Sequence, residues 1–179
     1  MSVLDKIAAK IMPPESDEDR REARAKARVL SKNHPWLAEV LSHHEMIEQA
    51  FAHAKAARSP DDALAATKVL GALLASHSIA EEVVLYPALV INDHKANAMM
   101  AYEEQQMAKV EMGMLEKLPP LSQEWREKLE HIEGAVAHHI YEEESIWYPK
   151  LAKEASSDDQ MQITRRFAEE WDRCTIPAD

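Results

Sequence analysis

Apolar residues recur at steps of three or four along most of the chain, the spacing that places side chains on one face of an α-helix. The clearest row lies near the C-terminal half and comprises Trp125, Leu129, Ile132, Val136 and Ile146. No segment alternates apolar and polar residues as a half-buried strand does, and the chain holds only 3 glycines. The pattern therefore predicts an all-α fold.

Helix start and stop signals divide the centre of the chain into four long helices, over residues 37–57, 61–86, 93–118 and 122–148. Ser59 and Ser122 are the expected N-caps of the second and fourth helices. Pro87 and Pro149 are expected to end these same helices, because proline lacks the N–H that a helix interior needs. Short links between long helices predict an antiparallel four-helix bundle.

The flanking regions predict further helices outside this bundle. We expect a helical extension over residues 1–35, the bundle over residues 36–150 and a C-terminal helix that packs on the bundle within residues 151–179. Pro13 and Pro14 should break the extension, and Ser16 should cap a highly charged helix whose surface faces solvent. With 179 residues, the chain is long enough for one core.

Charge and cysteine content narrow the possible partners and the compartment. The chain has 32 acidic and 21 basic residues, a net charge of -11, which argues against nucleic acid or an anionic membrane as partner. Cys174 is the only cysteine, and the N-terminus does not resemble a secretory signal. We expect charges to interrupt every apolar stretch before the roughly 20 residues that a membrane span needs. These features predict a soluble, cytoplasmic protein.

A repeated motif carries the candidate chemistry. Residues 77–87 read HSIAEEVVLYP and residues 139–149 read HIYEEESIWYP, so both have the pattern HxxxEExxxYP. The histidine and the first shared glutamate are four residues apart in each copy, and therefore lie one turn apart on one helical face. This spacing suits two ligands of one metal centre.

The two motif pairs lie on the faces that should point into the bundle. His139 and Glu143 continue the apolar row of the fourth helix, and His77 with Glu81 continues the row of the second. A carboxylate in an apolar interior costs several kcal/mol unless something compensates its charge. Imidazole and carboxylate together suit Fe, Mn or Zn, and the absence of clustered cysteines excludes thiolate sites.

The first and third helices should add ligands at the same depth. His44 shares its face with Leu41, Ile47 and Phe51, whereas His43 is turned toward the flank. On the third helix Glu104 aligns with Ala101 and Met107, which makes it the expected ligand. The alternatives are that Glu103 or Gln105 faces inward, or that this ligand position is empty.

These residues together resemble the hemerythrin-like HHE cation-binding family, through SHHE at residues 42–45 and the two HxxxEExxxYP motifs. The resemblance implies a four-helix bundle with a non-haem di-iron centre. It places His44, His77, Glu81, His139 and Glu143 at ligand positions. The family usually has another histidine on the third helix, where this chain has Glu104.

The expected cofactor is a pair of iron ions, or of Mn or Zn, with a bridging oxo or hydroxo group and three carboxylates from Glu81, Glu104 and Glu143. Such a centre would bind or sense dioxygen, peroxide, nitric oxide or iron, and the additional carboxylate favours sensing over reversible oxygen carriage. A binding protein is favoured over a dedicated enzyme. The alternatives are a metal-free helical interaction bundle and a ferritin-like oxidase or storage protein, although the latter uses Glu-x-x-His spacing.

Overall fold

The computed structural model describes residues 15–175, which fold entirely into helices and the turns between them. The four long helices of the bundle are α3 (Pro35–Ala56), α4 (Pro60–Ala80), α6 (Lys95–Leu115) and α7 (Gln123–Glu142). Two π-helical segments, η1 (Glu81–Leu85) and η2 (Glu143–Trp147), extend α4 and α7, and they lead into α5 (Tyr86–Ile91) and α8 (Tyr148–Glu154). Two flanking helices complete this part of the chain, α2 (Asp17–Ser31) and α9 (Ser157–Thr175).

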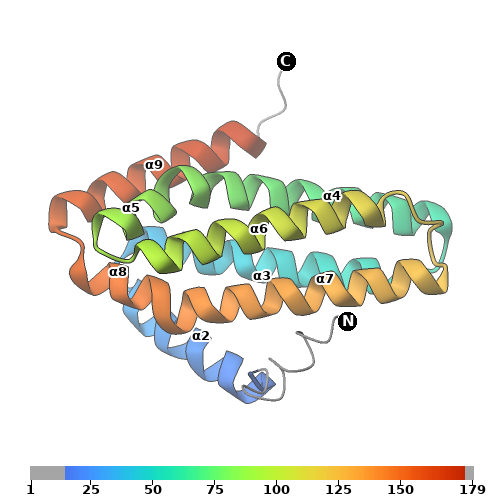
Figure 1. The fold of residues 1–179 in the computed structure, drawn as a ribbon, viewed down its shortest axis with the longest axis horizontal. Coiled ribbons are helices and arrows are strands. Elements are labelled where there is room, and N and C mark those ends of the chain that lie inside the picture. Colours follow the sequence, from blue (N-terminus) through green and yellow to red (C-terminus); the bar gives the residue numbers. More distant parts are fainter. Residues whose placement is uncertain (1–14, 176–179) are drawn as a thin grey trace.

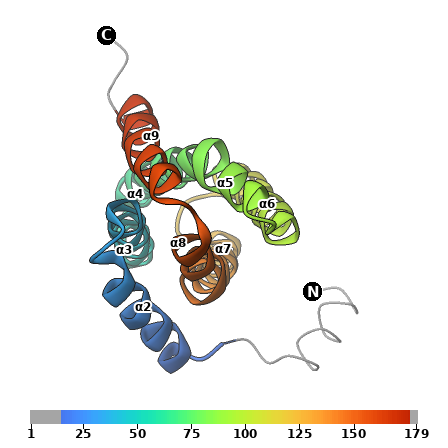
Figure 2. The same cartoon turned by 90° about the vertical axis from the view of Figure 1, so that its left-hand side faces the viewer.

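Consecutive bundle helices run in opposite directions and are joined by short turns, so the bundle is antiparallel as predicted (Figure 1). Viewed along the bundle, α3 lies between α4 and α7, and α6 closes the ring (Figure 2). The all-α four-helix bundle expected from the apolar pattern is confirmed. All four long helices can therefore direct residues toward one central level.

The two flanking helices pack on opposite sides of the bundle. Helix α9 lies against α3 and α4, whereas α2 lies against α3, α7 and η2 (Figure 2). Ser16 caps α2 through the backbone N–H of Asp19, as expected. The expectation that α2 only faces solvent is wrong for its inner side, where Ala23 and Ala27 are buried. The segment before residue 15, with the break expected at Pro13 and Pro14, lies outside the described residues.

The expected N-caps are confirmed, but the expected proline stops are wrong. The Ser59 hydroxyl accepts from the Asp62 N–H at 3.1 Å, and the Ser122 hydroxyl accepts from the Trp125 N–H at 3.1 Å. Pro87 and Pro149 do not end their helices, because each comes after a π-helical segment and stands in the first turn of the next α-helix. A proline is tolerated there because its missing N–H has no helical partner to lose.

The inward face of α6 differs from the predicted one. Ala98, Ala101, Gln105, Met112 and Leu115 are the buried residues of this helix. Met107, which was expected on the inward face, is 60% exposed, and Val110 and Met114 on the same side of the helix are 52% and 48% exposed. Apolar residues lie on both sides of α6, so periodicity alone did not fix its rotation.

One helical stretch, Pro60–Ile91, is long and apolar enough to cross a membrane by length and composition alone, contrary to the expectation that charges interrupt every such stretch. The buried core helix of a soluble protein passes the same test. In this structure the stretch spans α4, η1 and α5 and carries buried His77 and Glu81 within the bundle.

Candidate metal centre

A layer of buried polar side chains separates two apolar clusters in the bundle. One cluster surrounds Trp36, Tyr86 and Tyr148, and the other surrounds Phe51 and Leu129. Between them lie the side chains of His44, His77, Glu81, His139 and Glu143, each exposed by 7% or less. Because these groups are removed from water, they must satisfy one another or bind a further group.

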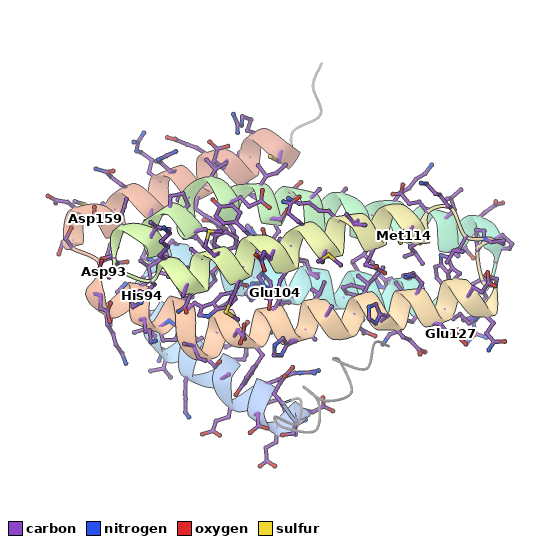
Figure 3. All side chains as sticks on the ribbon, viewed as in Figure 1. Asp93, His94, Glu104, Met114, Glu127 and Asp159 are labelled. Atoms are coloured by element: carbon purple, nitrogen blue, oxygen red, sulfur yellow. The ribbon has the colours of Figure 1, made fainter. Side chains whose placement is uncertain are left out.

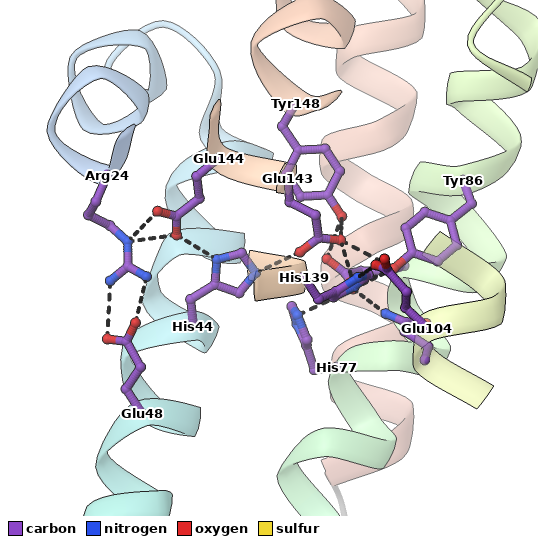
Figure 4. Close-up of polar contacts among 12 residues, drawn as sticks. Arg24, His44, Glu48, His77, Tyr86, Glu104, His139, Glu143, Glu144 and Tyr148 are labelled. Carbon is purple, nitrogen blue, oxygen red and sulfur yellow. Dashed lines mark hydrogen bonds and ion pairs between the residues drawn. The ribbon is translucent and has the colours of Figure 1, made fainter. Parts of the chain in front are cut away.

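Glu143 lies between two histidines that come from different helices. Its Oε2 is 3.2 Å from Nε2 of His44 on α3, and its Oε1 is 3.2 Å from Nε2 of His139 on α7 (Figure 4). The two oxygens therefore face two different imidazoles. This is the arrangement that a carboxylate needs to bridge two metal positions.

Glu81 occupies the corresponding place on η1. Its Oε2 is 3.3 Å from Nε2 of His77, one turn earlier in the same helix. His44, His77, Glu81 and Glu143 each offer a donor atom, and these four atoms lie within 4.8 Å of one another. His139 is not one of these four residues. Its Nε2 lies beside Oε1 of Glu143, the carboxylate oxygen that does not face His44.

Several ligand-type atoms of this layer are buried and form no hydrogen bond of good geometry in the described part of the chain. They include both ring nitrogens of His77, and Nε2 of His44 and Oε2 of Glu143, which face each other at 3.2 Å. Leaving such atoms unpaired costs about 1–3 kcal/mol each, and more where the group is charged. A metal ion among these atoms would satisfy them together, so the residues fit the group that their chemistry implies.

Each π-helical segment brings a tyrosine onto the glutamate that begins it. In a π-helix residues five apart share a face, and Tyr86 and Tyr148 stand five residues after Glu81 and Glu143. The Tyr148 hydroxyl is 2.5 Å from Oε1 of Glu81 and 2.7 Å from Oε1 of Glu143. The Tyr86 hydroxyl is 3.2 Å from both glutamates and from Nε2 of His139. Both tyrosine hydroxyls therefore belong to the polar layer.

Glu104 lies behind the polar layer in this structure. Its Oε2 is 2.7 Å from Nδ1 of His139, the ring nitrogen that points away from Glu143. Gln105 is the inward residue of α6, only 6% exposed, and its amide donates to Oε2 of Glu81 at 2.6 Å. The alternative in which Gln105 faces inward therefore describes this structure, and coordination of a metal by Glu104 stays a prediction.

The outer ring nitrogen of His44 contacts a carboxylate in the same manner, from a residue outside the predicted ligand set. Its Nδ1 is 2.7 Å from Oε1 of Glu144, which is 2% exposed. Arg24 of α2 donates from Nε to both oxygens of Glu144, at 2.6 and 2.7 Å, and its outer nitrogens reach Glu48 (Figure 4). A carboxylate on the outer nitrogen fixes the orientation and tautomer of a ligand histidine. Helix α2 thus reaches the centre through one arginine.

The ionisable groups of the layer have strongly shifted pKa values. Burial lowers the pKa of His44, but the adjacent carboxylates of Glu143 and Glu144 outweigh this and raise it to about 9. Burial and the charge of Glu143 raise the pKa of Glu81 to about 8. Burial lowers the pKa of His77 well below its usual value. The metal-free layer therefore holds protons at neutral pH that a cation would displace.

His43, the neighbour of His44, belongs to a different environment. Its ring stacks on Trp171 of α9 at a centroid distance of 3.6 Å and contacts Phe167. Burial, with the nearby charge of His44, lowers its pKa to about 4. The choice of His44 over His43 for the central layer agrees with these contacts.

A comparison with known protein families identifies the family of the domain that holds this layer. A family model described as the hemerythrin HHE cation-binding domain matches residues 15–151. The chain belongs to this family. Searches of curated proteins and of solved structures found no match.

The hemerythrin HHE match includes α2 as well as the bundle, since it begins at residue 15 rather than near Trp36 as expected. In a hemerythrin HHE domain, a buried group of histidine and glutamate side chains indicates metal binding. The family and the all-α fold expected from the SHHE segment and the repeated motif are confirmed.

Proposed function

We propose that this hemerythrin HHE domain is a non-haem di-iron protein that binds or senses dioxygen, peroxide, nitric oxide or iron. The observation that carries the proposal is the position of Glu143, whose two oxygens face His44 and His139 on opposite sides. His44, His77 and His139 would be terminal ligands, and Glu81 and Glu143 would bridge. Manganese and zinc accept the same donors and are the alternative metals.

The two metal positions are unequal in this proposal. Four protein donors converge on the side of His44 and His77. On the other side, His139 is joined by the bridging carboxylates, and the Tyr86 hydroxyl lies beside it. A position with fewer protein donors is the one that leaves room for an external ligand. We therefore assign small-ligand binding to the His139 side.

The ions, when bound, supply Lewis acidity and a redox couple to a small ligand. The residues of the chain position the metal ligands and exclude water from them. Glu144 and Glu104 orient the imidazoles of His44 and His139, and the apolar clusters on either side exclude water. The Tyr86 and Tyr148 hydroxyls hold hydrogens directed at the carboxylates, where they can restrain Glu81 and Glu143.

Stepwise metal titration under anaerobic conditions tests this proposal. We expect two ferrous ions to bind per chain, with the first bound more tightly than the second, because four protein donors surround only one position. A single binding step of one ion would contradict the di-iron assignment. Absence of binding would favour the alternative of a metal-free interaction bundle.

A further inference from the structure

A cavity of about 680 Å³ lies between α4, α6 and α7, beside the metal centre. Its walls are mainly apolar and include Ile47, Leu74, Met112, Ile132, Val136 and Ile140. Glu104 stands at its rim, between α6 and α7, on the side of the molecule that faces the viewer in Figure 3. The inner end of the cavity is formed by His77, Gln105 and His139.

The volume of this cavity exceeds what a diatomic ligand requires. One water-sized molecule occupies about 30 Å³, whereas sites for organic ligands typically measure roughly 300–1,000 Å³. An apolar cavity of this size is suited to an organic body that excludes water from the walls.

The inner end offers hydrogen-bonding atoms that no group in the described part of the chain satisfies. Nδ1 of His77 and Oε1 of Gln105 have no partner, and the two residues are only 4% and 6% exposed. When Nε2 of His77 serves as a metal ligand, as in the proposed function, Nδ1 carries the ring hydrogen and is a donor. Oε1 of Gln105 is an acceptor. A hydroxyl group both donates and accepts, so it can serve either atom.

The rim of the cavity selects against anionic ligands. Four acidic residues line it, Glu103, Glu104, Glu111 and Glu116, together with one lysine, Lys109. Lys109 is paired with Glu82 at 2.6 Å and Glu111 is paired with Lys128 at 2.5 Å, so the remaining acidic residues still give the rim an excess of negative charge. A carboxylate or phosphate group would be repelled there, whereas a neutral molecule would not.

We propose that this cavity binds a neutral organic molecule with an apolar body and one hydroxyl-type end, an alcohol or a hydroperoxide, and directs that end toward the metal centre. The inference deepens the proposed function and rests on it, because the polar end would lie beside His77 and His139. It adds an organic ligand to the small ligands of the proposed function.

Calorimetric titration of the iron-loaded full chain with 2-phenylpropan-2-ol tests the inference. We expect saturable binding of the alcohol, and binding at least tenfold weaker for 2-methyl-2-phenylpropanoate, its carboxylate counterpart. Ala135→Trp fills the cavity from an exposed wall position and should weaken alcohol binding at least tenfold. The matched variant Ala65→Trp, on an exposed position of α4 outside the cavity, should bind as the unaltered protein does.

The visible spectrum and the iron content of each sample complete the test. A change in the iron bands on adding the alcohol would support contact of the hydroxyl end with the centre. If iron is bound but the alcohol does not bind, or binds equally to Ala135→Trp, the inference is overturned and the proposed function stands. If no iron is bound, the proposed function fails, and with it the contact of the hydroxyl end with the centre.

Discussion

Two histidines of the polar layer, His44 and His139, have a carboxylate on the outer ring nitrogen and a second carboxylate on the inner one. The outer carboxylates, from Glu144 and Glu104, differ in exposure, since Glu144 is buried and the Glu104 side chain is 32% exposed. Such partners commonly change metal affinity 10–100-fold when they are removed. The metal affinity of a ligand histidine therefore depends on the carboxylate that contacts its outer ring nitrogen.

Removing either member of the second HxxxE pair should reduce both metal content and stability. His139→Ala and Glu143→Ala each remove a donor and leave the opposing buried groups without compensation, so we expect loss of at least one ion and a lower unfolding temperature. His138→Ala is the control, because His138 is an exposed neighbour that contacts Glu15 instead. Equal losses from His138 and His139 substitutions would show that the assignment of this helical face is wrong. Metal analysis with thermal unfolding measures both effects.

Glu104 can be tested as a ligand or as an orienting residue. Glu104→Gln keeps an acceptor for Nδ1 of His139 but removes the negative charge. If Glu104 only orients His139, this variant should retain two ions, with about tenfold weaker binding of the second. Loss of one whole ion from Glu104→Gln would establish the carboxylate as a ligand, as the sequence predicts.

Metal binding should release protons and strengthen as pH rises. In the metal-free protein His44, with a pKa of about 9, and Glu81, with a pKa of about 8, are mainly protonated at pH 7. Both must lose the proton to coordinate the first ion, so the binding constant of that ion should rise by up to about a hundredfold per pH unit below these values and level off above them. Metal titrations between pH 6 and 9 measure this slope. A metal-binding constant that does not change over that range would contradict the protonated state of the empty layer.

Individual ligand residues were predictable where the helical phase was clear. His139 and Glu143 continue a long apolar row that precedes them, and the row is buried as predicted. On α6 apolar side chains point both ways, so the sequence could not distinguish Glu104 from Gln105 as the inward residue. The positions of Tyr86 and Tyr148 were not predictable from α-helical spacing, because residues five apart share a face only where the helix becomes π-helical.

At the scale of elements, the π-helical segments rotate the inward face of the helical turns after them. Ile146, which continues the apolar row of α7 by α-helical counting, is 41% exposed, whereas its neighbour Trp147 is buried. The wider π-helical turn displaces the inward face by about one residue. The repeat YP in both motifs marks the place of this change, although proline by itself predicts only a helix end there.

Helix α2 should contribute to the centre although no residue of it approaches the inner donors. Arg24→Met keeps the apolar stem but removes the two hydrogen bonds to Glu144, which leaves the buried carboxylate behind His44 without its arginine counter-charge. We expect about tenfold weaker metal binding and a lower stability of the metal-free protein. The same change at exposed Arg21 of α2 is the matched control and should alter neither. Identical behaviour of the two variants would contradict a role for α2 in positioning His44.

At the scale of the whole molecule, the level of the polar layer is set by where the two apolar clusters of the bundle end. Each long helix is apolar on both sides of one polar level, so the bundle buries two cores with a polar layer between them. The four helices and the C-terminal helix were predictable from periodicity and caps. The packing of α2 was not, because its inner face consists of alanines and one arginine among many charges.

The central claim is that two metal ions lie on opposite sides of Glu143. Anomalous X-ray diffraction from crystals of the iron-loaded protein, measured at the iron absorption edge, tests this claim directly. We predict two peaks, one among His44, His77, Glu81 and Glu143, and one between Glu143 and His139. A single peak at the half-buried group of Glu104, His138 and Glu142, or no peak in the polar layer, would contradict the account.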